Sequence, residues 1–208
     1  MQLTWTVPEG TVESFTVFRD GEQLTSVPAT QTTFVDDTVL PLQRSTYEIE
    51  AVGGGITSER ATVQVRMPAA PLGEARLDGS FLVKAKATSH FGFTTFPGGF
   101  TTRWRFRATC PEGPCDTAWN DVNVHDFSTV LALSANGYAG SDQADFGKCG
   151  STFVTTTWTL DVTVVKAATI KDAWRATKID GTIEQRSAAQ LGCVATGADY
   201  RFTGTIER

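Results

Sequence analysis

The residues 103-RWRFRATCPEGPC-115 bring together side chains with the chemistry for a functional site. Three arginines alternate with a tryptophan and a phenylalanine, and two cysteines follow. Arginines beside exposed aromatic rings bind nucleic acid, arginines alone bind anions such as sugar acids, and paired cysteines hold zinc or form a disulfide. Which of these chemistries is possible depends on the element that positions the side chains.

The alternation in this stretch has a period of two residues, which predicts a β-strand. On a strand, Arg103, Arg105 and Arg107 share one face, whereas Trp104 and Phe106 share the other. A nucleic-acid platform needs rings and positive charges on the same surface. The pattern therefore predicts a structural wall with its arginines outside, keeps an anion site on the three arginines as an alternative, and predicts no nucleic-acid partner.

The four cysteines, Cys110, Cys115, Cys149 and Cys193, form an even set, which indicates two disulfides made in an oxidising compartment. The turn-forming PEGP between the first two favours Cys110 with Cys115, which leaves Cys149 with Cys193. A structural zinc site usually uses two close cysteine pairs, and the sequence has one. We therefore expect no metal and a secreted or cell-surface protein.

No catalytic residue or cofactor site is predicted. The two histidines, His90 and His125, are not accompanied by a G-x-S-x-G motif. Asp121, Asn123 and Asp126 near His125 offer oxygen ligands for Ca²⁺, but they lack the spacing of a calcium loop, so we expect a solvated turn there. A hydrolase remains an alternative, because two catalytic carboxylates can meet in space without any sequence signature.

Aromatic residues outside the regular strands are the candidate ligand-binding residues. The polar flanks of Trp119 and Trp174 favour these two as the exposed indoles among five tryptophans, with packing in the core or at its rim as the alternative for each. Exposed indoles stack on sugar rings. The loop-like stretch 91-FGFTTFPGGF-100 adds Phe91, Phe93 and Phe96 among flexible glycines. These five residues are predicted to contact a glycan or a protein.

Charge and composition limit the other partners. The net charge of −5 lies in residues 1–73, with four basic and nine acidic residues, whereas residues 74–208 carry fourteen of each sign. Neither segment has the basic excess of a general nucleic-acid or membrane binder. No apolar run of about 18 residues is present, so no membrane insertion is expected.

A break at 67-MPAAPLGEA-75, with two prolines and small residues, separates two runs of β-pattern. We therefore expect a domain at 1–68, a linker at 69–75 and a second domain at 76–208.

The first domain carries short alternating strands in the order L-x-W, F-T-V-F-R-D-G, T-F-V-D-D, a Leu-Pro turn and then Y-E-I-E-A-V. This series resembles a fibronectin type III domain over about 65 residues, which implies a β-sandwich of six strands here, with Tyr47 as the corner tyrosine whose hydroxyl returns to upstream backbone. The turn from Leu40 to Tyr47 is longer than usual. The first strand of the fold has no counterpart, which leaves an exposed sheet edge and suggests a piece of a longer protein.

The second domain is also predicted to be antiparallel β. Alternating runs at 80–88, 127–135, 152–165 and 199–208 indicate strands, and only 167-AATIKDAWRAT-177 is compatible with a short helical turn. Such strands close into a barrel or stack as a jelly-roll-like sandwich. The fold class expected is all-β: a fibronectin type III-like β-sandwich followed by a larger, disulfide-bonded antiparallel β-domain.

These inferences favour a non-catalytic extracellular or cell-surface binding or adhesion fragment. The fibronectin-like module would be a spacer, a role that the resemblance links to secreted bacterial enzymes and adhesins. The second domain would recognise a glycan or protein, as a monomer or as part of a longer chain. The alternative is a lipocalin-like barrel that carries a small apolar ligand, because eight strands enclose enough space for one.

Overall fold

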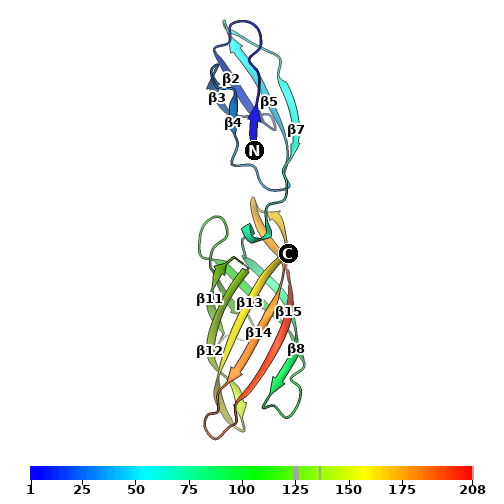
Figure 1. The fold of residues 1–208 in the computed structure, drawn as a ribbon, viewed down its shortest axis with the longest axis vertical. Helices are drawn as coiled ribbons and strands as arrows, with labels where there is room; N and C mark the ends of the chain where they lie inside the picture. Colours follow the sequence, from blue (N-terminus) through cyan, green and yellow to red (C-terminus); the bar gives the residue numbers. More distant parts are fainter. Residues whose placement is uncertain (124–126, 136, 208) are drawn as a thin grey trace. The chain divides into compact units, whose positions relative to one another are not determined.

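In a computed structural model, which describes residues 1–123, 127–135 and 137–207, the chain forms two compact units, Met1–Ala69 and Ala70–Arg208 (Figure 1). The described residues are almost entirely antiparallel β-structure, which confirms the all-β class. They include no helix long and apolar enough to cross a membrane. Each unit is described by itself below.

The first unit contains the six expected strands and one further short strand, β6. The strands are β1 (Gln2–Thr4), β2 (Ser14–Arg19), β3 (Glu22–Pro28), β4 (Thr33–Val35), β5 (Arg44–Gly53), β6 (Ile56–Thr57) and β7 (Ala61–Arg66). β1 pairs with β4, whereas β2 lies between β3 and β5, and both β6 and β7 pair with β5. Phe15, Val17 and Tyr47 form the centre of the core.

The hydrogen-bond partner expected for the Tyr47 hydroxyl, an upstream backbone group, is wrong. Its hydroxyl donates to the buried carboxylate of Asp36 at 2.8 Å and not to upstream backbone. Arg19 also reaches this carboxylate at 2.6 Å, and Thr38 donates to it through its amide and its hydroxyl. A charged acceptor this close captures the phenol more strongly than a carbonyl would.

The second unit is a closed barrel, which decides between the two architectures expected from the sequence. Its strands are β8 (Gly79–Phe91), β9 (Gly99–Ala108), β10 (Thr117–Asp121), β11 (Ser128–Ser134), β12 (Gly137–Cys149), β13 (Thr152–Ile170), β14 (Ala173–Ser187) and β15 (Thr196–Ile206). Neighbours in sequence pair antiparallel from β8 to β15, and β15 closes the ring on β8 (Figure 1). Closure pairs every strand on both sides and so leaves no sheet edge.

The pleat of β9 confirms the expectation for the arginine-rich stretch. Arg103, Arg105 and Arg107 are exposed, whereas Trp104 and Phe106 are 0% and 1% exposed. Inside the barrel, Trp104 meets Trp119 edge to face at 5.3 Å between ring centroids. The other close ring pairs are Trp104 with Phe202, Phe81 with Phe106, Phe127 with Trp158, and Phe100 with Tyr200, with centroids 4.7–5.4 Å apart.

Two segments differ from the sequence-based expectation. Residues 167–177 form the hairpin between β13 and β14 rather than a helical turn. Residues 70–75, expected in the linker, belong to the barrel unit: a 3₁₀ turn, η1 (Leu72–Glu74), precedes Ala75 and Leu77, which are buried in the core. Burial of these two apolar side chains keeps the segment on the barrel.

Candidate binding surface at one end of the barrel

Three of the four connections at one end of the barrel form a surface that we call the tip; the fourth, 122–127, is only partly described. The three are residues 92–98 between β8 and β9, 150–151 between β12 and β13, and 188–195 between β14 and β15. Because the strands alternate in direction, the tip is the end opposite to the one where residues 70–78 enter the unit, and it is the lower end of the barrel in Figure 1. Loops held by a rigid scaffold are where binding residues concentrate.

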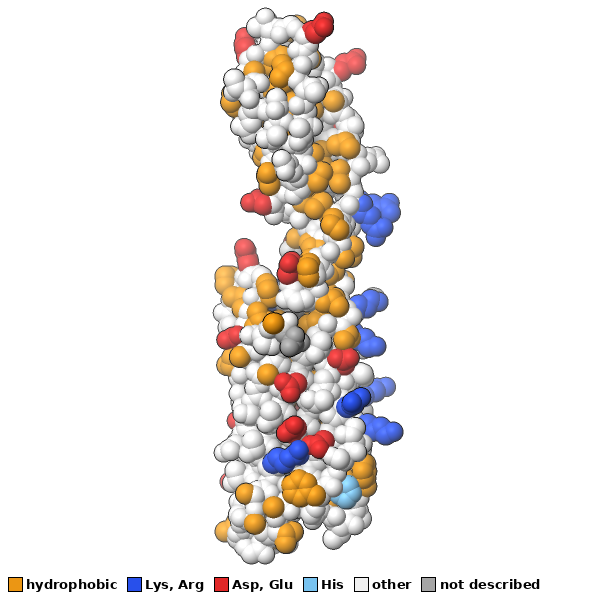
Figure 2. Space-filling model, viewed as in Figure 1, with side chains coloured by type: hydrophobic (Ala, Val, Ile, Leu, Met, Phe, Trp, Pro, Cys, Tyr) orange, Lys and Arg blue, Asp and Glu red, His pale blue; other side chains and the backbone are white. Residues whose placement is uncertain are grey.

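The tip exposes large apolar side chains from its loops and from the strand ends beside them. They are Phe91, Phe96, Phe153, Leu191 and Val194, with exposed fractions from 49% to 71%. Figure 2 shows hydrophobic side chains gathered over this end of the barrel. Single apolar residues are common on protein surfaces, whereas groups of them at one site are typical of interaction surfaces.

Local backbone geometry explains why the chain presents these residues. Gly92 and Gly98 have φ angles of +70° and +71° and turn the first loop at both ends. Leu191 adopts φ 54° although it is not glycine, and its side chain is 71% exposed. Strained backbone of this kind clusters at binding sites. At Gly197, an added Cβ would lie 2.4 Å from the ring of Phe91, so this glycine leaves room for the ring to lie against the backbone.

Cationic side chains rim the apolar residues. The Arg186 guanidinium lies 5.8 Å from the ring centroid of Phe91, and the Lys148 ammonium lies 5.1 Å from that of Phe153. Arg186 also pairs with Asp199 at 2.5 Å. Hydrogen bonds from Ser89 and Arg186 lower the pKa of Asp199. The tip is thus an apolar patch with a polar border that carries charges of both signs.

His90 packs beneath the first loop. Its ring lies 5.0 Å from Phe96, edge to face, and 6.5 Å from Phe93. Its Nδ1 is buried and has no hydrogen-bond partner among the described residues. His90 therefore packs as a support for the two phenylalanines.

A pocket of about 250 Å³ opens between the loops of the tip. Phe93, Val154 and Val194 supply apolar lining, and Lys148, Gln185 and Ser187 supply polar groups. The disulfide Cys149–Cys193 forms part of the wall and ties the β12–β13 hairpin to the loop 188–195. The expected pairing of these cysteines is confirmed, and the bond holds two of the three connections together.

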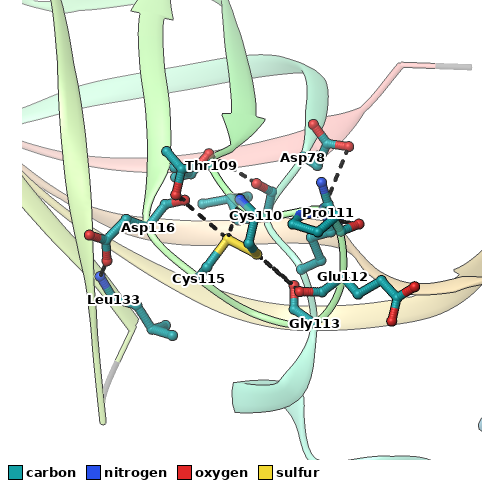
Figure 3. The surroundings of a disulfide bond; sticks show 12 residues. Asp78, Thr109, Cys110, Pro111, Glu112, Gly113, Cys115, Asp116 and Leu133 are labelled. Atoms are coloured by element: carbon teal, nitrogen blue, oxygen red, sulfur yellow. Dashed lines mark hydrogen bonds and ion pairs between the residues drawn. A yellow bond between two sulfur atoms is a disulfide. The ribbon is translucent and has the colours of Figure 1, made fainter.

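The second expected disulfide, Cys110–Cys115, lies at the other end of the barrel and closes the turn between β9 and β10 (Figure 3). Thr109 donates through its amide and its hydroxyl to the carbonyl of Asp116, at 2.9 and 2.8 Å. The carboxylate of Asp116 accepts from the Leu133 amide at 2.8 Å. This arrangement is a structural clamp. The two disulfides together indicate folding in an oxidising environment.

The structure brings only part of the predicted ligand-binding set together. Phe91 and Phe96 are exposed at the tip, and Phe93 faces its pocket. The prediction that Trp119 is exposed is wrong, since its side chain is 1% exposed and packs against Trp104 inside the barrel. Trp174 lies apart from the tip: it is half-buried at the opposite end of the barrel, as in the alternative of rim packing, and its indole N–H donates to the carbonyl of Pro71 at 3.2 Å.

The expected solvated turn at 121–127 is wrong at its first residue. Asp121 is 2% exposed, and its carboxylate accepts hydrogen bonds from the Thr102 hydroxyl at 2.7 Å, the Asn123 amide at 2.9 Å and the Trp104 indole at 3.2 Å. His125 and Asp126 lie outside the described residues. Within residues 1–123, 127–135 and 137–207, no group of three His, Cys, Asp or Glu side chains is arranged to hold a metal ion.

Sequence reasoning missed Phe153, Leu191 and Val194. One signal was available for Phe153: in 152-TFVTTTWTLDV-162 it is out of phase with the inward Val154, Trp158 and Leu160, so it had to face outward.

Comparison of the chain with protein-family models, curated proteins and solved structures found no match.

Proposed function

We propose that this chain is a non-catalytic, extracellular or cell-surface binding fragment whose barrel tip contacts a protein or a glycan. The observation that supports this most strongly is the exposure of five large apolar side chains at one barrel end, from two loops and the adjoining ends of β8 and β13. Burying them would remove a large apolar area from water. The disulfide Cys149–Cys193 supports the same role, because a surface ordered in advance loses less entropy on binding.

The composition of the tip fits a binding interface. Such interfaces place aromatic and aliphatic anchors at the centre and polar groups at the rim. Here Phe96, Leu191 and Val194 are the anchors, and Lys148 and Arg186 stand at the border beside aromatic rings. A protein partner would cover the anchors, whereas a glycan would stack on the phenylalanine faces and bond to the rim.

The alternative function, an apolar carrier, has less support. Aromatic side chains occupy the interior of the barrel, with ring centroids as close as 4.7 Å between Phe127 and Trp158. The pocket at the mouth measures about 250 Å³, and sites for drug-sized ligands have roughly 300–1,000 Å³. An interior ligand would have to displace rings that already contact one another.

For the first unit we propose the role of a spacer. The pairing of β1 with β4, and of β2 with β3 and β5, is consistent with a sandwich of the fibronectin type III kind. The extended hydrogen-bond network around Asp36 and Tyr47 serves stability. Extracellular location is part of the same proposal and rests on the two disulfides.

An array that presents immobilised glycans and peptides tests the binding function. Wild-type protein should bind a subset of spots, and F96S/L191S should lose that binding at least about tenfold, since each substitution removes a large apolar contact. V130S/V165S is the matched control, because Val130 and Val165 are exposed apolar residues on β11 and β13, outside the tip. An equal loss of binding in both variants would show that the tip is not the binding surface. Displacement of a hydrophobic dye from the wild-type interior would favour the carrier instead.

A further inference from the structure

A second surface, separate from the tip, lies on the outer face of the adjacent strands β15, β8 and β9. Its exposed cationic residues, which we call the basic face, are Lys84, Lys86, Arg103, Arg105, Arg107 and Arg201. Figure 2 shows a column of Lys and Arg side chains along one flank of the barrel, on the side where Figure 1 places β8 and β15. Residues 74–208 carry equal numbers of basic and acidic residues, so this column is a segregation of charge and not an excess.

Strand register places like charges next to one another on this face. Lys86 on β8 lies directly opposite Arg201 on β15. Opposed like charges destabilise a strand pair, so folding alone does not favour this arrangement. On the other side of β8, Lys84 pairs with Thr101, which puts Arg103 at the diagonal position. The cations therefore form a continuous path across three strands.

Little acidic charge neutralises the basic face. Arg103 pairs with Glu207, with nitrogen–oxygen distances of 2.5 and 2.8 Å. Among the described residues, none of the other five cations forms an ion pair. Lys86 pairs with Gly99 on β9. From Gly99 to Arg107 the strand advances eight residues, so the cations extend over roughly 26 Å at the rise of a strand.

We propose that the basic face binds an extended acidic polysaccharide, with sulfate or carboxylate groups on the cations. Hydroxyl groups of Thr101, Thr203 and Thr205 are exposed between the charges and suit the hydroxyls of sugar rings. This site goes beyond the function proposed for the tip and uses none of the tip residues.

The chemistry of the face favours a polysaccharide over the other polyanions. Single-stranded nucleic acid needs exposed rings for its bases, but Trp104 and Phe106 point into the barrel. Peripheral membrane binding combines cations with inserted apolar side chains. Between the cations, Leu82 is the one large apolar side chain that the described residues expose, at 41%.

Binding of the full chain to size-fractionated heparin, a sulfated polysaccharide, tests the proposal. In titration calorimetry, K84Q/K86Q should bind at least about tenfold more weakly than wild type at low salt. Its affinity should also depend less on salt concentration, because a complex with fewer charge contacts releases fewer counterions when it forms. The matched control is K166Q/K171Q, which makes the same change in net charge at exposed lysines away from the basic face. It should bind as wild type does, and K84R/K86R should retain binding. Thermal unfolding checks that all variants fold.

Three results would overturn the proposal: no binding of wild type to heparin, equal weakening in the control and test variants, or tighter binding to a 20-base-pair DNA duplex or to phosphatidylglycerol vesicles than to heparin. Neutral dextran should not bind. F96S/L191S should bind heparin as wild type does. The proposal for the basic face and the proposal for the tip can therefore be refuted independently of each other.

Discussion

The indole N–H of Trp104 donates to the buried carboxylate of Asp121 at 3.2 Å inside the barrel. The same carboxylate accepts from the Thr102 hydroxyl at 2.7 Å, so β9 and β10 are joined by side chains as well as by their ladder. The amide of Asn123 also donates to Asp121 and fixes the chain as it leaves β10. A buried carboxyl group is tolerated where hydrogen-bond donors surround it in this way.

Removing this acceptor should destabilise the barrel. In D121A the Trp104 indole and the Thr102 hydroxyl lose a buried partner, and we expect a loss of about 2–4 kcal/mol in the free energy of unfolding. D121N should lose less, since an amide oxygen still accepts. Urea unfolding followed by tryptophan fluorescence measures both. A D121A value within about 0.5 kcal/mol of wild type would contradict the role given to Asp121.

The first unit should lose stability at both extremes of pH. Burial and the Asp36 carboxylate raise the pKa of Tyr47 to about 12, so the stability gained from its neutral form is complete below the ordinary value of 10.0 and is lost between pH 10 and 12. Burial alone would raise the pKa of Asp36, but hydrogen bonds from Thr38 and Tyr47 and the charge of Arg19 outweigh it and lower that pKa. The contribution of Asp36 is therefore lost as the pH falls below its ordinary value of 3.8.

Hydrogen exchange in strands β2 and β5 at different pH values measures these losses segment by segment. Y47F should remove the alkaline loss between pH 10 and 12 and cost about 1.5–3 kcal/mol at neutral pH, because a hydrogen bond to a charged group is removed. An alkaline loss in Y47F as large as in wild type would show that another group is responsible.

The two disulfides should contribute unequally. In the chain-entropy picture, the bond that spans 44 residues, Cys149–Cys193, contributes about 4 kcal/mol, and the bond that spans 5 residues, Cys110–Cys115, about 2 kcal/mol. Urea unfolding of C149S/C193S and of C110S/C115S should therefore give the larger loss for the first. A larger loss in C110S/C115S would mean that the clamp around Asp116 depends on its disulfide more than on its hydrogen bonds.

The alternation in β9 and the spacing of the cysteines were sufficient to predict the pleat and both disulfides. The burial of Trp119 was not predictable in the same way. Its neighbours two residues away, Thr117 and Asp121, are polar, which is typical of a solvent-exposed strand face, yet both are buried. Asp121 is inside because Trp104 and Thr102 supply donors, and these partners are distant in sequence.

Long-range contacts also decided the other differences. Trp174 is half-buried because residues 71–77 return onto the barrel, and its N–H meets the carbonyl of Pro71, 103 positions away. The phenylalanines of 91–100 were predictable from composition, but their meeting with Leu191 and Val194 depends on closure of β15 on β8. A local pattern carries no information about which loops share one end of a barrel.

Footprinting by hydroxyl radicals tests the central claim, that the tip is the binding surface of a barrel with a filled interior. The full chain is labelled alone and with a glycan or peptide that it binds on the array. We predict that protection falls on Phe91, Phe96, Phe153, Leu191 and Val194, while Val130 and Val165 react equally in both samples. Protection of Val130 or Val165 with the five tip residues unchanged would contradict the account.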